Sequence, residues 1–159
     1  MAANEYQFLT TWSISAPQPL IYEILKNGAD YPRWWPDVYL EANLHPSGRP
    51  DGIGDRVVLL TKGRLPYKLR WTAISEEFEP PSKIGIRAEG DFVGSGVWRL
   101  KEREGITHIT FDWRLRADKP LLRWLSPLLK PLFKWNHHWA MSTGLTRLKL
   151  EAQKRMSES

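Results

Sequence analysis

Hydrophobic and polar residues alternate with a period of two over most of this chain, which is the pattern of β-strands with one buried and one exposed face. The segment ITHITFDWRLRAD shows it most clearly, because Ile109, Phe111 and Trp113 alternate with polar residues. Short gaps with Gly or Pro favour an antiparallel sheet with one wet and one dry face. The pattern predicts strands over residues 5–15, 37–45, 54–63, 65–79, 82–90, 91–104 and 106–118.

Helical spacing replaces the alternation after the first strand. Pro17 and Pro19 suit a helix start, apolar residues follow at helical spacing, and Gly28 suits the end of that helix. A second short helix or turn is predicted from Tyr31 to Trp35. Two short helices therefore separate the first strand from the other six.

The C-terminal region predicts a long helix over residues 131–156, where Gly144 is the one helix breaker. Glycine inside a helix costs about 1 kcal/mol relative to alanine, so Gly144 indicates close approach of a ligand or a strand. Before this helix, residues 119–135 are cut by three prolines, which favours a pair of short helical turns over one continuous helix. In the sheet, Gly94 and Gly96 either leave room beside the dry face or mark a bulge.

The dry face of the sheet needs a cover, and the C-terminal helix is the element large enough to provide it. We expect an α+β fold in one domain, residues 1–159, with a curved seven-stranded antiparallel sheet wrapped around that helix. A sheet of this length curls, so a chamber can remain between sheet and helix. The alternation assigns to the dry face Phe8, Trp12, Leu40, Tyr67, Leu69, Trp71, Ile86, Trp98, Phe111 and Trp113.

Composition agrees with a globular protein that has a large core. Hydrophobic residues make up 42% of the 159 residues, and nine are tryptophans, which suit cores and ligand chambers alike. The absence of cysteine excludes disulfides, thiolate metal sites and a cysteine nucleophile. The N-terminus lacks a secretory pattern, and no uncharged apolar run approaches the ~20 residues of a membrane span. We therefore expect a cytoplasmic protein.

The net charge of +5 is concentrated in one segment. Residues 119–149 contain six basic and no acidic residues, and the rest of the chain balances 17 basic against 18 acidic residues. Leucines, aromatic residues and lysines in 119–135 suit transient contact with an anionic membrane, although these leucines could instead roof the core. Nucleic acid is not an expected partner, because the basic residues do not line one element and the aromatic residues lie in the buried phase.

Two segments carry a resemblance to a known family. YPRWWPDV, after the first helices, and WNHHWAMSTGLTRL, in the terminal helix, are similar to segments of bacterial cyclase/dehydrase-type members of the START-like (SRPBCC) superfamily. The order of elements resembles the helix-grip fold of that superfamily over nearly the whole chain. The resemblance implies a cavity between sheet and C-terminal helix that takes lipids, polyketides or other hydrophobic molecules.

The titratable residues allow a weaker statement about chemistry. His137 and His138 lie about 100° apart on a helix, whereas a two-histidine metal site favours i, i+4 spacing, so we expect no metal and no cofactor. One of the two histidines can face the chamber while the other meets solvent or a loop. Tyr67 is the titratable residue of the dry face. Tyr67, His137 and His138 are thus the catalytic candidates, and a purely structural role for each is the alternative.

The sequence as a whole favours a carrier or sequestering protein for a hydrophobic small molecule. A cyclase or dehydratase acting on a polyketide-like or aromatic substrate is the first alternative, and membrane-surface lipid transfer or presentation is the second. Ligand identity and oligomeric state do not follow from the sequence. The expected ligand-binding residues are Trp35, Tyr67, Leu69, Trp71, Trp98, Phe111, Trp113, Met141 and Leu145.

Overall fold

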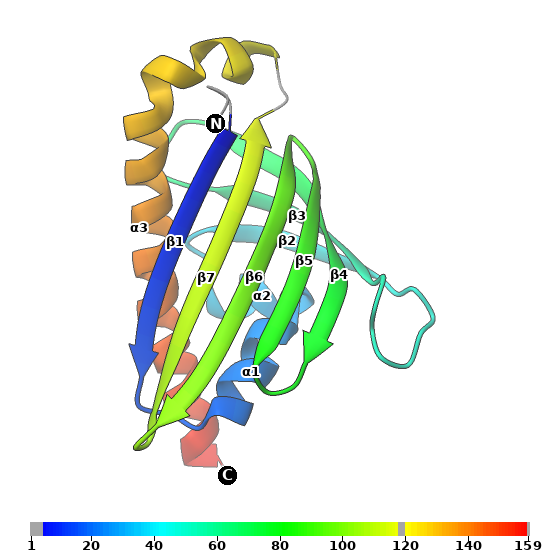
Figure 1. The fold of residues 1–159 in the computed structure, drawn as a ribbon, viewed down its shortest axis with the longest axis vertical. Coiled ribbons are helices and arrows are strands. Elements are labelled where there is room, and N and C mark those ends of the chain that lie inside the picture. The colour runs from blue at the N-terminus through cyan, green and yellow to red at the C-terminus, as the bar shows by residue number, and fades with distance from the viewer. Residues whose placement is uncertain (1–4, 118–119, 159) are drawn as a thin grey trace.

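A curved antiparallel sheet wraps around the helices of the protein, and a long C-terminal helix runs beside its concave face (Figure 1). The computed structural model describes residues 5–117 and 120–158; the side chains of residues 117 and 120–127 lie outside this description. The strands are β1 (Glu5–Ile14), β2 (Tyr39–His45), β3 (Arg56–Lys62), β4 (Lys68–Glu79), β5 (Lys83–Gly90), β6 (Phe92–Arg103) and β7 (Ile106–Ala117). They form one seven-stranded antiparallel sheet, as predicted, and its strand order is β1-β7-β6-β5-β4-β3-β2, so the first strand pairs with the last.

The helices also follow the predicted order. Helix α1 (Gln18–Lys26), the short 3₁₀ helix η1 (Gly28–Asp30) and α2 (Tyr31–Trp34) follow the first strand, and α3 (Pro120–Glu158) ends the chain. Gly28 differs from its expected role as a helix cap, because it begins η1 and the cap position is Asn27. The expected helix-grip architecture is confirmed.

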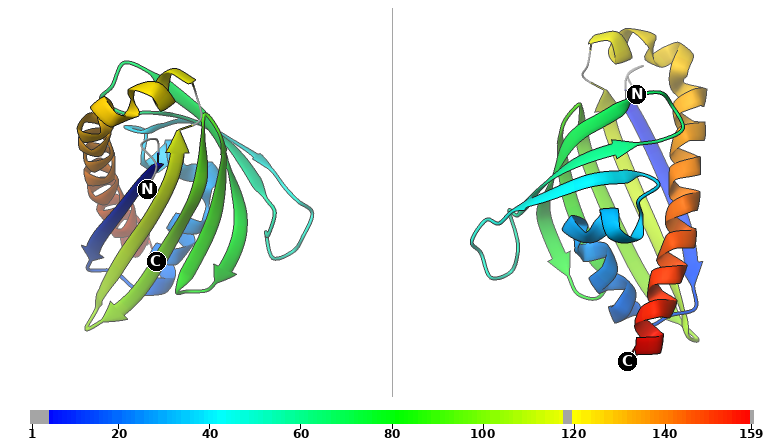
Figure 2. Two further views of the ribbon diagram at one scale, coloured as in Figure 1. Left: turned by 45° about the horizontal axis from the view of Figure 1, so that its top comes forward. Right: turned by 180° about the vertical axis from the view of Figure 1, so that it is seen from behind.

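Helix α3 is continuous where two separate helical turns were expected. Its first part lies across one end of the sheet and then changes direction into the long part that runs beside β1 (Figures 1 and 2). Pro120 occupies the helix start, where its missing N–H costs little. Prolines at positions 127 and 131 lack the backbone N–H of a regular helix, and α3 bends in this region without ending. Within the described residues, no helix is both long and apolar enough to cross a membrane.

The concave face of the sheet carries the core, as the alternation predicts. Trp12, Trp71, Trp98 and Trp113 are all buried there. The assignment of Leu40 to this face is wrong. The register of β2 against β3 shifts just after Tyr39, which places Tyr39 against the core and leaves Leu40 beside a polar surface groove.

Ion pairs attach the C-terminal part of α3 to α2 and to the residues around it. Glu151 is 6% exposed and accepts hydrogen bonds from Arg33 at 2.6 Å and from Arg155 at 2.8 Å. Arg147 donates to Asp37 at 2.7 Å. Arg147 belongs to the basic segment 119–149, so part of that segment's excess charge is neutralised inside the fold.

Candidate functional site

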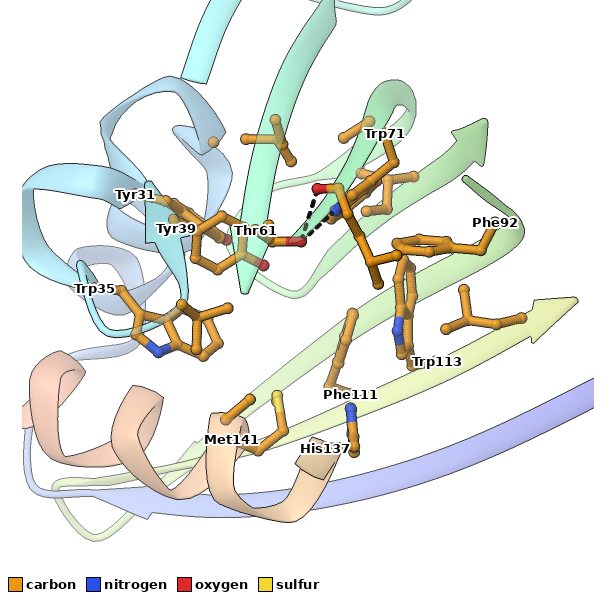
Figure 3. A pocket seen from close by; sticks show the side chains of 18 of the residues that line it. Tyr31, Trp35, Tyr39, Thr61, Trp71, Phe92, Phe111, Trp113, His137 and Met141 are labelled. Atoms are coloured by element: carbon orange, nitrogen blue, oxygen red, sulfur yellow. Dashed lines mark hydrogen bonds between the residues drawn. The ribbon is translucent and has the colours of Figure 1, made fainter. Parts of the chain in front are cut away.

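A cavity of about 240 Å³ lies between the concave face of the sheet and α3. All seven strands, the end of α1, α2 and the middle of α3 contribute side chains to its wall. Figure 3 shows these side chains converging on a common space, with Trp35 and Tyr31 at one side and Phe92 and Trp113 at the other. The expected separation of sheet and helix is therefore present.

The structure brings together most of the residues predicted to bind a ligand. Leu145 is the exception, because it packs half-buried against the core and does not line the cavity. A ligand-binding role for the others stays a prediction, since position alone does not demonstrate it. The predicted residues that line the cavity are Trp35, Tyr67, Leu69, Trp71, Trp98, Phe111, Trp113 and Met141.

Stacked aromatic rings form the sheet side of the cavity. The ring centroids of Trp98 and Phe111 are 4.1 Å apart, those of Phe111 and Trp113 are 5.4 Å apart, and Trp71 lies 5.5 Å from Trp113. Offset and tilted rings at these separations attract one another beyond simple burial. The result is a broad, rigid and apolar surface that faces the guest space.

Gly96 makes room for this aromatic wall. A Cβ at Gly96 would lie 2.7 Å from the ring of Trp113, the residue directly opposite in β7. The pairing of β6 runs in continuous register through Gly94 and Gly96, so the alternative of a bulge is wrong. The space above Gly96 is filled by the Trp113 and Phe111 rings and is not left for a ligand.

Gly144 has a comparable role on α3. The close approach expected there is made by the side chain of Trp35, and not by a ligand or a strand. Trp35 is 2% exposed, and its Nε1 donates to the hydroxyl of Thr143 at 3.1 Å. This contact fixes the segment after α2 against the terminal helix.

Several polar groups in the cavity wall are already engaged by the protein. The hydroxyl of Thr61 accepts from Nε1 of Trp71 at 3.2 Å and donates to the carbonyl of Leu69 at 3.3 Å (Figure 3). The Tyr31 hydroxyl donates to the carbonyl of Leu25 at 2.6 Å. Because these groups are already hydrogen-bonded within the protein, they offer little to a polar ligand, and the wall of the cavity around them behaves as an apolar surface.

The two neighbouring histidines occupy different environments. His137 lines the cavity and stacks on Phe8 with ring centroids 4.2 Å apart, whereas His138 is exposed and lies outside the cavity wall. Burial, with a smaller effect of His138, lowers the pKa of His137 to about 4. The Nε2 atom of His137 is buried without a hydrogen-bond partner among the described residues. His138 is consequently remote from any chemistry inside the chamber.

Tyr67 lines the cavity at its side near the first part of α3. Its ring meets Phe133 edge-on with centroids 6.4 Å apart. Burial, followed by the neighbouring Tyr6, raises the pKa of Tyr67 to about 12. The phenol is therefore protonated at neutral pH and can donate a hydrogen bond, but it is a poor proton acceptor.

A contact between the β3–β4 loop and α3 closes part of the cavity wall. The side-chain oxygen of Asn136 accepts from the backbone N–H of Arg64 at 2.7 Å, and the Arg64 guanidinium lies 5.6 Å from the ring centre of Trp139. Asn136 has no local signal in the sequence, because its partner is a backbone group 72 residues away. Tyr39 was not among the predicted site residues either, because the β2 register shift turns it inward.

The described residues contain no cluster of three or more His, Cys, Asp or Glu side chains that could hold a metal ion. Among the described residues that line the cavity, Asp91 is the one carboxylate, and Lys26 and Lys62 are the cationic side chains. What the arrangement offers chemically is an apolar, ring-lined space with a few hydrogen-bonding groups at its edge.

Comparisons with known proteins agree with this architecture. The family model described as polyketide cyclase/dehydrase and lipid transport matches residues 7–153. Among curated proteins, no sequence matches the chain.

Solved structures resemble the fold at low sequence identity. The Zhui aromatase/cyclase from Streptomyces sp. R1128 has a TM-score of 0.74 and 19% identity, covering 96% of each chain. A START superfamily protein from Mycobacterium smegmatis has a TM-score of 0.74 and 14% identity, covering 93% of this chain and 97% of that one. The di-domain aromatase/cyclase BexL also scores 0.74 at 14% identity; 94% of this chain is covered, and it spans half of BexL.

Proposed function

Because this chain belongs to the family of polyketide cyclase/dehydrase and lipid-transport proteins, we propose that it binds one hydrophobic small molecule between the sheet and α3. The START-like resemblance of its sequence is confirmed by that membership. The observation that carries the proposal is the cavity of about 240 Å³ with stacked aromatic rings along its sheet side. Ligand sites are typically concave, mainly apolar and largely preformed, with a few placed polar groups.

The burial of a flat guest supplies the binding energy in this proposal. Apolar surface removed from water contributes about 25 cal/mol per Å², and aromatic surfaces add the preference for offset stacking. The rings of Trp98, Phe111 and Trp113 are already packed against one another. They lose little freedom when a guest arrives, which favours affinity.

Binding without chemical change is favoured over catalysis by the state of the candidate residues. General acid–base catalysis works best when the pKa of the group lies near the working pH. The pKa of His137 is lowered to about 4 and that of Tyr67 is raised to about 12, so both move away from neutrality. The cyclase or dehydratase alternative would depend on these two groups, because His138 lies outside the cavity wall.

Native mass spectrometry of freshly purified protein tests the proposal directly. We expect an adduct that dissociates to a hydrophobic small molecule without covalent change. Ala73 lines the cavity and Thr72 points to the other face of β4, so Ala73→Phe and Thr72→Phe form a matched pair. Ala73→Phe should lose the adduct and Thr72→Phe should keep it. A wild-type protein that carries no guest and binds no apolar probe would contradict the proposal.

Membrane-surface lipid transfer is a second candidate, favoured by a specific surface on α3. Leu128, Leu132 and Trp135 are 81%, 41% and 50% exposed and share one helical face, which we call the outer face. Lys130 and Lys134 lie on the other side of the same helix, where the Lys130 ammonium is 5.4 Å from the ring centre of Tyr6, and Phe133 lines the cavity. Exposed apolar residues on a helix that also carries lysines suit an anionic bilayer, where each basic residue near the surface contributes about 1 kcal/mol.

The segment proposed for this contact, residues 119–135, is only partly described. Lys119 lies outside the described residues, and so does the side chain of Arg123. The described part nevertheless places an exposed apolar face on the same helix as the cavity-lining Phe133.

Cosedimentation with phosphatidylglycerol vesicles at low salt tests the membrane contact. Replacing both Lys130 and Lys134 by glutamate should weaken binding by at least about tenfold, since two attractive charges become repulsive. The exposed Lys149 and Lys154, changed to glutamate together, give the same change of net charge away from the outer face. Absence of cosedimentation by the wild-type protein, or equal loss in both double variants, would contradict docking through this face.

A further inference from the structure

His137 lines the cavity and carries a buried hydrogen-bonding atom. Its ring extends from α3 toward Phe111 (Figure 3), and its other side is covered by Phe8. The Nε2 atom is buried and has no hydrogen-bond partner among the described residues. Buried polar atoms in folded proteins are nearly always paired, and one that is not indicates a missing partner.

The described residues that contact the His137 ring or lie beside it in the wall are aromatic or apolar. Phe8 stacks on the ring, and Phe111 and Met141 lie beside it in the same wall. The nearby Asn136 uses its side-chain oxygen to accept from the backbone of Arg64. This nitrogen is already desolvated and unpaired in the fold, so a guest without a hydrogen-bonding atom leaves it unpaired, whereas a guest oxygen that reaches it supplies the missing hydrogen bond.

The charge state of His137 limits which polar group can serve. Burial lowers the pKa of the ring to about 4, so the imidazole is neutral at physiological pH. A neutral imidazole nitrogen pairs well with a hydroxyl or a carbonyl oxygen, depending on its tautomer. A carboxylate at the same point would lose its hydration among aromatic rings, which is unfavourable for a charged group.

We infer that the cavity selects a flat, mainly aromatic guest whose single hydroxyl or keto oxygen hydrogen-bonds to Nε2 of His137. The inference rests on the proposed hydrophobic binding function and adds the chemical class of the guest. In this arrangement the ring wall supplies affinity, and His137 distinguishes an oxygen-bearing guest from a hydrocarbon of the same shape. It also discriminates against an ionised acid of similar size.

Calorimetric titration with three probes of one ring system tests this selectivity. Naphthalene, 2-naphthol and 2-naphthoate differ in having no polar group, a neutral hydroxyl and a carboxylate. We expect the wild-type protein to bind 2-naphthol about five- to tenfold more tightly than naphthalene, the effect of one net hydrogen bond. The naphthoate should bind more weakly than 2-naphthol.

His137→Phe and His138→Phe are the matched variants. His137→Phe should bind naphthalene as well as the wild type and lose the preference for 2-naphthol. His138→Phe should keep that preference, because His138 is exposed and lies outside the cavity wall. Circular dichroism checks that both variants fold, and His137→Met provides a second apolar replacement if the phenylalanine does not fit.

The outcomes separate this inference from the function on which it rests. Equal wild-type affinity for naphthalene and 2-naphthol, a preference that survives in His137→Phe, or tightest binding of naphthoate would each overturn the role of His137. Binding of the hydrocarbon would still support the apolar cavity in those cases. Failure of every probe to bind the folded wild-type protein would count against the hydrophobic binding function itself.

Discussion

The indole ring of Trp35 packs against Gly144 of α3 so closely that a methyl group at Gly144 would come within 3.0 Å of it. Trp35 also donates to the neighbouring Thr143 hydroxyl at 3.1 Å. One side of the ring lines the cavity, and the other side packs against the terminal helix. The position of α3 beside the cavity therefore depends on Gly144, because any larger residue would clash with Trp35.

Gly144→Ala should destabilise the protein by about 1–3 kcal/mol, the usual cost of overpacking a tight core. Alanine favours the helix by about 1 kcal/mol, and the clash with a buried ring outweighs that gain. Urea unfolding measures the change. Gly28→Ala is the control, because its added Cβ would meet its nearest atom, in Val57, at 3.8 Å. A Gly144→Ala protein more stable than wild type would refute the packing argument.

The stability of the protein should fall as the pH is lowered from about 6.5 to 4. His137 has a pKa of about 4 in the fold and an ordinary value of 6.5 when unfolded, so the unfolded chain takes up a proton over this window and the folded chain does not. The loss is on the order of 2 kcal/mol and is absent above pH 6.5. His137→Phe should lose less stability over the same window in denaturant unfolding. Parallel pH profiles of the two proteins would contradict this prediction.

Glu151 should account for a second, more acidic loss of stability. Its hydrogen bonds with Arg33, opposed by burial and aided by Arg155, lower its pKa to about 2 from 4.5. A lowered carboxyl pKa stabilises the fold above pH 4.5, and this contribution is lost as the pH falls toward 2. Glu151→Gln should therefore cost about 2–3 kcal/mol at pH 7 and almost nothing near pH 2. Thermal unfolding of the wild type and Glu151→Gln at pH 7 and near pH 2 measures this. An equal difference in stability between the two proteins at both pH values would contradict the prediction.

Asn136→Ala should speed the exchange of a bound guest. Its side chain ties α3 to the β3–β4 loop through the Arg64 N–H, and losing that hydrogen bond lets this part of the wall open more often. We expect association and dissociation of 2-naphthol to accelerate together by about two- to tenfold, with little change in affinity. Stopped-flow fluorescence measures both rates. Exposed Gln153→Ala, at the far end of α3, should exchange at the wild-type rate.

The strands could be predicted because one face of each is buried. Ile109, Phe111 and Trp113 are apolar, alternate with polar residues in the sequence, and are buried in the structure. The error at Leu40 arose from a register shift after Tyr39, which reverses the alternation without a visible change in residue type. Proline suggested a break in α3 where the backbone bends and continues. Local rules describe single elements well, and they miss features that depend on how two elements meet.

The same limit applies to the site. Most of its lining followed from the strand phases, whereas the separate environments of His137 and His138 required the actual position of α3. The role of Gly144 was anticipated as a close approach, but its partner could not be identified, because Trp35 lies 109 positions earlier in the chain. Asn136 gave no sequence signal at all. Contacts of this kind are set by tertiary geometry.

Different parts of helix α3 anchor it to the fold and line the cavity. Arg147 and Glu151 hold the C-terminal part by ion pairs, while Asn136, His137 and Met141 line the cavity one or more turns earlier. Substitutions in the guest-facing turns can therefore change which molecule is accepted without loosening the anchors. Such a separation would let related proteins diverge in specificity while keeping one scaffold, and it marks residues 133–141 as the stretch to vary when engineering a new guest preference.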